Sequence, residues 1–228
     1  MGPKKSLIFL LLLLLNTVPI VYGRVNEQKK EENIVSPKQV LTGGTVGAAK
    51  NACRYIIKDG GTRAYNGLNI FDTAFKTSKG DPKWFARIDH ATVKNPVTHL
   101  NVNKAITGVP DPHIKISGAT AKAVGLTGKA LKFVQKVAPI AMAASVAYDA
   151  YEVVGDWNRG DQKLAAKKVV TKTAQYTGAS CGATTGAAIG TAIFPGVGTL
   201  IGGIVGGVAG NIAGGIGGKL VAEAVVPR

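Results

Sequence analysis

Residues 176–218 read YTGASCGATTGAAIGTAIFPGVGTLIGGIVGGVAGNIAGGIGG, and the organisation of the C-terminal part of the chain follows from them. No charged residue lies between Lys172 and Lys219, and Phe194-Pro195-Gly196 divides the run near its middle. Two arms of about 20 residues result, each about 30 Å long as a helix. Glycine recurs at four-residue spacing in both arms: Gly178, Gly182, Gly186, Gly190, Gly198, Gly202, Gly206, Gly210, Gly214 and Gly218. We predict a glycine-zipper helical hairpin over residues 177–228.

These glycine stripes indicate close contact between helices. Each glycine inside a helix lowers the stability of the helix by roughly 1 kcal/mol relative to alanine. Ten glycines in two helices therefore require a compensating contact with another helix. Helices in lipid use small residues at this spacing to approach one another. The pattern favours insertion of the hairpin into a membrane, conditional or constitutive. A soluble hairpin packed against lysine-rich helices and self-association through the stripes, as a homo-oligomer or a structural assembly, are the alternatives.

Residues 118–176 predict basic amphipathic helices before the hairpin. Pro139 is expected to bend or end the first of them, residues 140–154 to form the next, and Asp161 to cap a third that runs toward Gly178. Each lysine near an acidic bilayer adds about 1 kcal/mol to binding, so we expect the first helix to bind anionic lipid. Four lysines lie within about 80° of one another on its helical wheel: Lys122, Lys129, Lys132 and Lys136.

Four short segments follow one another in this half of the chain: KALKFV from Lys129, AYDAYEVV from Ala147, GDWNRGD from Gly155 and IFPGVGT from Ile193. Together with the glycine arms, this order resembles a module of secreted bacterial polymorphic toxins and contact-delivered effectors. The resemblance covers about 110 residues. It implies a part that aids membrane association or the delivery of a toxic domain.

Residues 46–117 predict a small α+β domain. Residues 46–58 can form a helix, and strands are expected over residues 84–91, 98–103 and 113–117 because apolar and polar residues alternate there. This alternation sends His99 and His113 to a polar face, with Arg87, Asp89, Asn101, Asn103, Lys115 and Ser117. Two histidines can cleave RNA without a metal, one accepting the 2′-hydroxyl proton and the other protonating the leaving oxygen. A basic residue would stabilise charge on the phosphate.

Three short patches in this region, RIDH from Arg87, PVTHLN from Pro96 and DPHIK from Asp111, resemble nuclease domains of bacterial polymorphic toxins with a barnase/EndoU/RelE-like fold. The resemblance implies His99, His113, Arg87 and Lys115 as candidate catalytic residues and RNA as a partner. A solvated face without chemistry is the alternative. The histidine spacings match no compact zinc motif, so we expect no metal and no cofactor.

The first 23 residues predict a signal peptide, with Lys4 and Lys5 before an apolar run. Residues 24–45 are polar and predict an extended arm or a pro-segment. Cleavage would change the net charge of +15 to about +13, which favours anionic partners. Cys53 and Cys181 either form a disulfide in an oxidising compartment or are buried unpaired thiols.

The sequence therefore predicts an α+β fold, with a small helix-plus-antiparallel-sheet domain followed by an all-α region ending in the hairpin. The expected function is that of a secreted toxin-like or host-defence protein that associates conditionally with anionic membranes and permeabilises them. A secreted ribonuclease that uses its C-terminal half for delivery is the alternative, and a self-assembling structural protein is the second alternative.

Overall fold

We analysed a computed structural model of the chain, which describes residues 35–60, 66–108, 110–111 and 113–226. Residues 38–228 form one compact unit. The predicted signal peptide at residues 1–23 and most of the predicted arm at residues 24–45 lie outside the described residues.

The first described helix, α2, spans Pro37–Arg54 and runs directly into strand β1, Tyr55–Asp59. The prediction of a helix over residues 46–58 was therefore wrong at both ends, and the end of the predicted arm is helical. Proline fits the first turn of a helix because its missing N–H would have no partner there. Tyr55 and Ile57 enter the buried core, so pairing with the next strand replaces the helix at this point.

The junction between α2 and β1 is fixed by an ion pair. Arg54 Nη2 lies 3.0 Å from Oδ2 of Asp72, a buried residue of strand β2 (Asn66–Lys76). The hydrogen bond to this carboxylate raises the pKa of the Arg54 guanidinium, and burial raises the pKa of the neighbouring Tyr55 hydroxyl. The helix end and the sheet are thus held together by charge as well as by packing.

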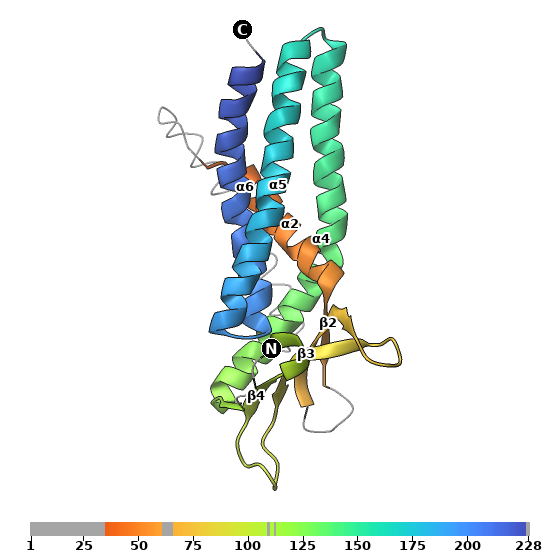
Figure 1. The fold of residues 1–228 in the computed structure, drawn as a ribbon. Helices are drawn as coiled ribbons and strands as arrows, with labels where there is room; N and C mark the ends of the chain where they lie inside the picture. Colours follow the sequence, from red (N-terminus) through yellow and green to blue (C-terminus); the bar gives the residue numbers. More distant parts are fainter. Residues whose placement is uncertain (1–34, 61–65, 109, 112, 227–228) are drawn as a thin grey trace, which may run out of the picture. The chain divides into compact units, whose positions relative to one another are not determined.

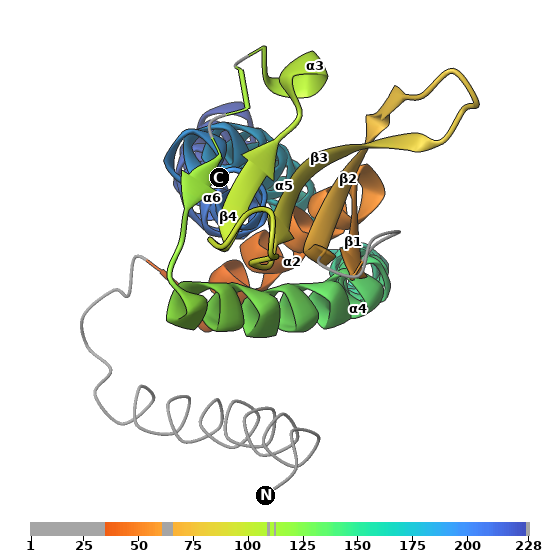
Figure 2. The same ribbon diagram turned by 90° about the horizontal axis from the view of Figure 1, so that it is seen from below.

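The sheet has five antiparallel strands in chain order: β1, β2, β3 (Pro82–Asp89), β4 (His99–Val102) and β5 (Ile114–Lys115). A short helix, α3 (Lys104–Thr107), follows β4. The three strands predicted from alternation are present: β3 begins and ends two residues earlier than predicted, and β4 and β5 are shorter than predicted. β1 and β2 were not predicted. Viewed from below, the strands lie side by side, and the first part of α4 (Gly118–Asn158) runs along them (Figure 2).

One face of the sheet forms the main apolar core. Leu68, Ile88 and Leu100 pack there with Leu131 of α4 and Leu200 of α6 (Val197–Val225). The turn before α6 also contacts this face, because a Cβ on Gly196 would lie 2.9 Å from the Cβ of Ala86. Gly196 has a φ of 91°, a conformation that other residues rarely adopt. The turn of the hairpin is therefore docked on the sheet.

Three long helices make up the rest of this unit: α4, α5 (Gln162–Ile193) and α6 (Figure 1). α4 continues through Pro139 and changes direction along its length, so the proline bends the helix rather than ending it. α5 crosses the predicted boundary between residues 176 and 177 without a break. Asp161 occupies the N-cap position of α5, as predicted, but makes no side-chain capping bond. The predicted α+β fold is confirmed.

Candidate functional site

The two predicted glycine stripes face each other along α5 and α6. A Cβ added to Gly182 would overlap the carbonyl oxygen of Gly206, and one added to Gly206 would overlap that of Gly182. Gly178, Gly186 and Gly190 meet α6 backbone in the same way, whereas Gly214 and Gly218 meet Ala174 and Thr171 of α5. The predicted helical hairpin is confirmed, and its ten predicted glycines form a continuous seam within one chain, which we call the first seam.

A second seam joins α2 to α6 and was not predicted. A Cβ on Gly43 would lie 2.6 Å from the carbonyl oxygen of Gly207, and one on Gly47 would overlap the carbonyl oxygen of Gly203. The signal in the sequence was the spacing of four between Gly43 and Gly47, together with the paired glycines of α6. α6 therefore carries one stripe for α5 and a second, one residue further on, for α2.

Both stripes of α6 are occupied by helices of the same chain. Mainly backbone atoms of α5 fill the first. At the second, Gly207 meets α2 backbone, whereas Gly203 meets the side chain of Asn51 from α2. The sequence left open that the glycine stripes join two copies of the chain. Such self-association would require a helix to leave its partner within the same chain.

In much of α4, α5 and α6, small and polar residues are buried and large apolar residues are exposed, which is the reverse of the pattern in a water-soluble bundle. We use the term helix bundle for residues 139–193 and 201–225. Its buried positions hold only small or polar residues: Asp149, Asp156, Ala165, Gln175, Ala179, Ala183, Gly190, Gly203, Gly207, Asn211, Gly215, Gly218 and Ala222. Large apolar side chains face outward: Ile140, Val146, Tyr151, Val154, Trp157, Leu164, Val169, Ile189, Ile193, Ile201, Val205, Ile216, Leu220, Val221 and Val225.

Two helices in the described part of the chain, α4 and α6, are long and apolar enough to cross a membrane. Core helices of soluble proteins meet the same criterion, but they are mostly buried. Only 11% of the most apolar window of α4 and 28% of that of α6 are buried. The apolar surface of both helices is thus largely uncovered.

The charges inside the bundle are paired. Asp149 Oδ1 lies 2.9 Å from Lys38 Nζ and 3.0 Å from Lys172 Nζ, and the Tyr176 hydroxyl donates to Asp149 Oδ2 at 2.9 Å. Asp156 pairs with Arg159 and, at 2.6 Å, with Lys168. A buried carboxylate without a partner would cost several kcal/mol, so these contacts hold α2, α4 and α5 together.

The predicted anion-binding lysines do not share one environment. Lys132 Nζ lies 3.4 Å from Asp59 Oδ2 of β1. Lys122 and Lys129 line a hollow of about 460 Å³ between α4 and the sheet, whereas Lys136 is exposed elsewhere on α4. The opposite side of this helix is apolar as predicted, and Leu131 is buried in the core.

The structure brings His99 and His113 together, with ring centroids 5.5 Å apart. Lys115 is the register partner of His99, and Arg87 lies on the neighbouring strand of the same face. His113 has a φ of 42°, and its Nε2 lies 3.9 Å from Asp111 Oδ2. Side chains held in a rarely populated backbone conformation cluster at functional sites. The four predicted catalytic candidates therefore lie near one another, and their chemistry stays a prediction.

The alternative of a solvated face holds only for its outer part, because His113 and Lys115 are exposed whereas the middle of the face is buried. Asn101 is fully buried, and Asp89 and His99 are nearly so. These polar side chains tolerate burial because Asp89 Oδ2 accepts from Arg87 Nε at 2.9 Å and from Asn101 Nδ2 at 2.7 Å. Asn103 and Ser117, expected on the same face, instead cap helices α3 and α4.

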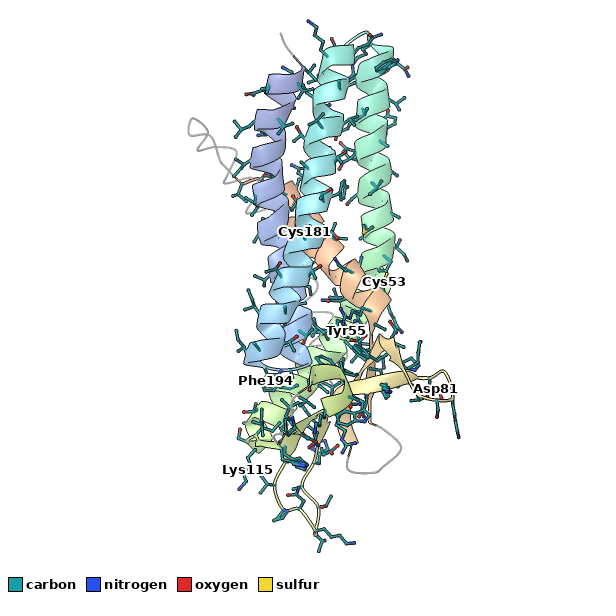
Figure 3. The ribbon with its side chains drawn as sticks, viewed as in Figure 1. Cys53, Tyr55, Asp81, Lys115, Cys181 and Phe194 are labelled. Carbon is teal, nitrogen blue, oxygen red and sulfur yellow. The ribbon has the colours of Figure 1, made fainter. Side chains whose placement is uncertain are left out.

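Cys53 and Cys181 are unpaired and exposed, so the structure shows neither the predicted disulfide nor the alternative of buried thiols. Figure 3 labels both: Cys53 lies near the end of α2 and Cys181 on α5, beside the seam residue Gly182. Within the described residues, no group of three or more His, Cys, Asp or Glu side chains could hold a metal ion.

Comparison with known proteins gives two matches along the chain. Residues 38–134 match the C13G5.2-like N-terminal domain, and residues 158–217 match the C13G5.2-like glycine zipper domain. The C-terminal half contains a glycine zipper domain. This glycine zipper domain coincides with α5 and most of α6, where the first seam lies. Neither matched domain is described as a toxin or a nuclease.

The chain is also similar to the uncharacterized Caenorhabditis elegans protein C13G5.2, with 41% identity over 159 residues. The match covers 68% of this chain and 45% of the relative, so the chain spans less than half the length of that protein. No solved structure matches the chain.

Proposed function

We propose that this chain is a secreted, membrane-active protein of the toxin or host-defence type. Its glycine zipper domain associates with anionic membranes and permeabilises them. The observation that carries the proposal is the reversed burial of the helix bundle, with glycine, alanine and paired charges inside and Val, Ile, Leu, Tyr and Trp outside. Helices in lipid associate through close backbone contacts, and their apolar outer surface faces the acyl chains. In water, exposure of such a surface is unfavourable.

The docked turn of the hairpin supports conditional rather than constitutive insertion. Phe194, Val197 and Leu200 pack into the core of the sheet, so the closed conformation shields this end of the hairpin. The apolar residues further along α5 and α6 remain exposed for a first contact with lipid. Insertion of the whole hairpin then requires the turn to leave the sheet.

Vesicle leakage tests this proposal. Because the apolar bundle surface and the excess of basic residues act together, we expect the purified protein to release a trapped dye from vesicles containing phosphatidylglycerol but not from pure phosphatidylcholine vesicles. The same samples are analysed by flotation. Co-flotation without leakage would restrict the function to membrane association, and absence of both would contradict the proposal.

The histidine cluster supports a second candidate function, cleavage of RNA. His99 Nδ1 lies 2.8 Å from the carbonyl oxygen of Val97, and because a carbonyl oxygen can only accept, Nδ1 is the donor in this contact and Nε2 is the candidate base. The exposed His113 is then the candidate acid, and Lys115 and Arg87 are the candidate phosphate ligands. This assignment follows the two-histidine chemistry predicted from the sequence.

For this second candidate, we expect His113→Ala to lower RNA cleavage at least 100-fold, because general acid catalysis contributes about 10²–10⁴-fold. His113 is exposed, so the variant should fold. Lys115→Gln should also reduce the rate, whereas the charge-matched control Lys94→Gln on an exposed loop should not. The measurement is cleavage of a fluorogenic RNA oligonucleotide with a chelator present. An inactive wild-type protein, or an unchanged rate in His113→Ala, would eliminate this function.

A further inference from the structure

The hollow between α4 and the sheet combines cationic and apolar walls. It measures about 460 Å³, and Lys122, Lys129 and His90 line it together with Gly125, Leu126 and Leu68. It lies at the sheet end of α4, and the strand residues Leu68 and Ile88 that line it are on the face of the sheet opposite to the histidine pair. Neither the proposed permeabilisation nor the proposed RNA cleavage uses it.

The charge in this hollow is not neutralised. Asp59 also lines it, but its carboxylate pairs with Lys132 at 3.4 Å. Among the residues that the structure describes, Lys122 and Lys129 have no carboxylate within ion-pairing distance, and seven residues separate them along α4, which puts both on one side of the helix. Two free ammonium groups over one hollow favour an anionic ligand.

The walls between these charges suit an amphiphile. Leu126 lies between the two lysines in the sequence and is 66% exposed, and the buried residues Leu68 and Ile88 line the same hollow. The His90 ring occupies the space beside Gly67, where a Cβ would lie 2.7 Å from its Nε2. A Cβ on Gly125 would meet nothing within 4 Å, so the hollow is open at this point.

We propose that this hollow binds the headgroup of an anionic phospholipid. Lys122 and Lys129 hold the phosphate, His90 donates a further hydrogen bond, and Leu126 contacts the first part of the acyl chain. Lysine binds phosphate as a compact point charge, so it needs no fixed fork geometry. The inference rests on the proposed membrane association and assigns the lipid preference to one site rather than to the net charge of the protein.

Two kinds of variant distinguish a specific lipid-binding site from a general attraction between the basic protein and anionic lipid. Lys122→Gln/Lys129→Gln removes both charges, and we expect about 30-fold weaker binding to phosphatidylglycerol-containing vesicles, since each lysine near the surface contributes about fivefold. Gly125→Leu keeps the charge and fills the hollow, and it should also weaken this binding at least 5-fold. Binding to phosphatidylcholine vesicles should not change in either variant.

The matched controls are Lys76→Gln/Lys79→Gln, at the exposed β2–β3 turn, and Gly118→Leu, where a Cβ also meets nothing within 4 Å. Both should bind like the wild type. Equal weakening by the two lysine pairs, or wild-type binding by Gly125→Leu, would overturn the site. Wild-type binding to vesicles without anionic preference would overturn the site and leave the membrane function intact.

Soluble glycerol phosphate distinguishes the remaining cases. Titration into the full protein should shift the amide resonances of Gly125 and Leu126, and the shifts should disappear in Lys122→Gln/Lys129→Gln. Shifts in a protein that binds no vesicles would identify a site for soluble phosphate esters and overturn the lipid assignment. Absence of shifts together with anionic preference would place the preference outside the hollow.

Discussion

Gly206→Ala should destabilise the protein, although alanine is the better helix former. The added Cβ would overlap the carbonyl oxygen of Gly182 in the facing helix, and no rotamer change can relieve a contact between a Cβ and backbone. Overpacking of this kind costs about 1–3 kcal/mol, which exceeds the gain of roughly 1 kcal/mol in helix propensity. We expect the two helices to separate along the first seam.

Gly217→Ala is the matched control because it lies on the same helix and its Cβ would meet nothing within 4 Å. Only the propensity gain remains there, so this variant should be more stable than the wild type. The propensity gain is the same in both variants, so they should differ by the overpacking cost of about 1–3 kcal/mol, or roughly 2–12 °C in Tm for a chain of this size. The measurement is thermal unfolding followed by far-UV circular dichroism. Equal Tm values would mean that close contact of α5 and α6 at the first seam does not stabilise the protein.

Val205→Arg should greatly weaken membrane association without affecting the fold. Val205 is 61% exposed on α6, so arginine there has room in water. At the centre of a bilayer the same side chain costs about 2.5–3.5 kcal/mol. We expect roughly 100-fold weaker partitioning into vesicles, measured by flotation at a series of lipid concentrations.

The control for this variant is Val93→Arg, the same substitution at a fully exposed residue of the sheet region. Both variants add one positive charge, so any change in attraction to anionic lipid is matched. Val93→Arg should float like the wild type, and both variants should keep the wild-type Tm. If Val205→Arg binds vesicles as tightly as Val93→Arg, the outer surface of α6 does not enter lipid.

The hairpin could be predicted because its signal is local. The four-residue glycine period, the uncharged run and the Phe194-Pro195-Gly196 turn all lie within one stretch, and each stripe faces the other across that turn. The second seam could not be found in this way, because Gly43 and Gly47 lie far from Gly203 and Gly207 in the sequence. The spacing of four between Gly43 and Gly47 indicates a close helix contact, but nothing local identifies α6 as the partner helix.

For the histidine face, the side of the strand could be predicted from the sequence, but the burial of its residues could not. Alternation correctly placed His99 and Asn101 on one face of β4, but alternation alone cannot distinguish a solvated polar face from a buried one. Burial here depends on the hydrogen bonds that Asp89 accepts from Arg87 and Asn101. Likewise, helix periodicity placed the lysines of α4 on one side, but only the tertiary fold shows that Asp59 pairs with Lys132 and leaves Lys122 and Lys129 free of carboxylate partners among the described residues.

The depth of residue 205 in a bilayer tests the central claim most directly. With Cys53 and Cys181 replaced by serine and Val205 by cysteine, a fluorophore at this position reports on the outer surface of α6. The account predicts quenching by nitroxides attached deep in the acyl chains and protection from iodide in the water. Quenching by iodide alone, in protein that floats with the vesicles, would contradict it, because the apolar surface of the bundle would then remain outside the lipid.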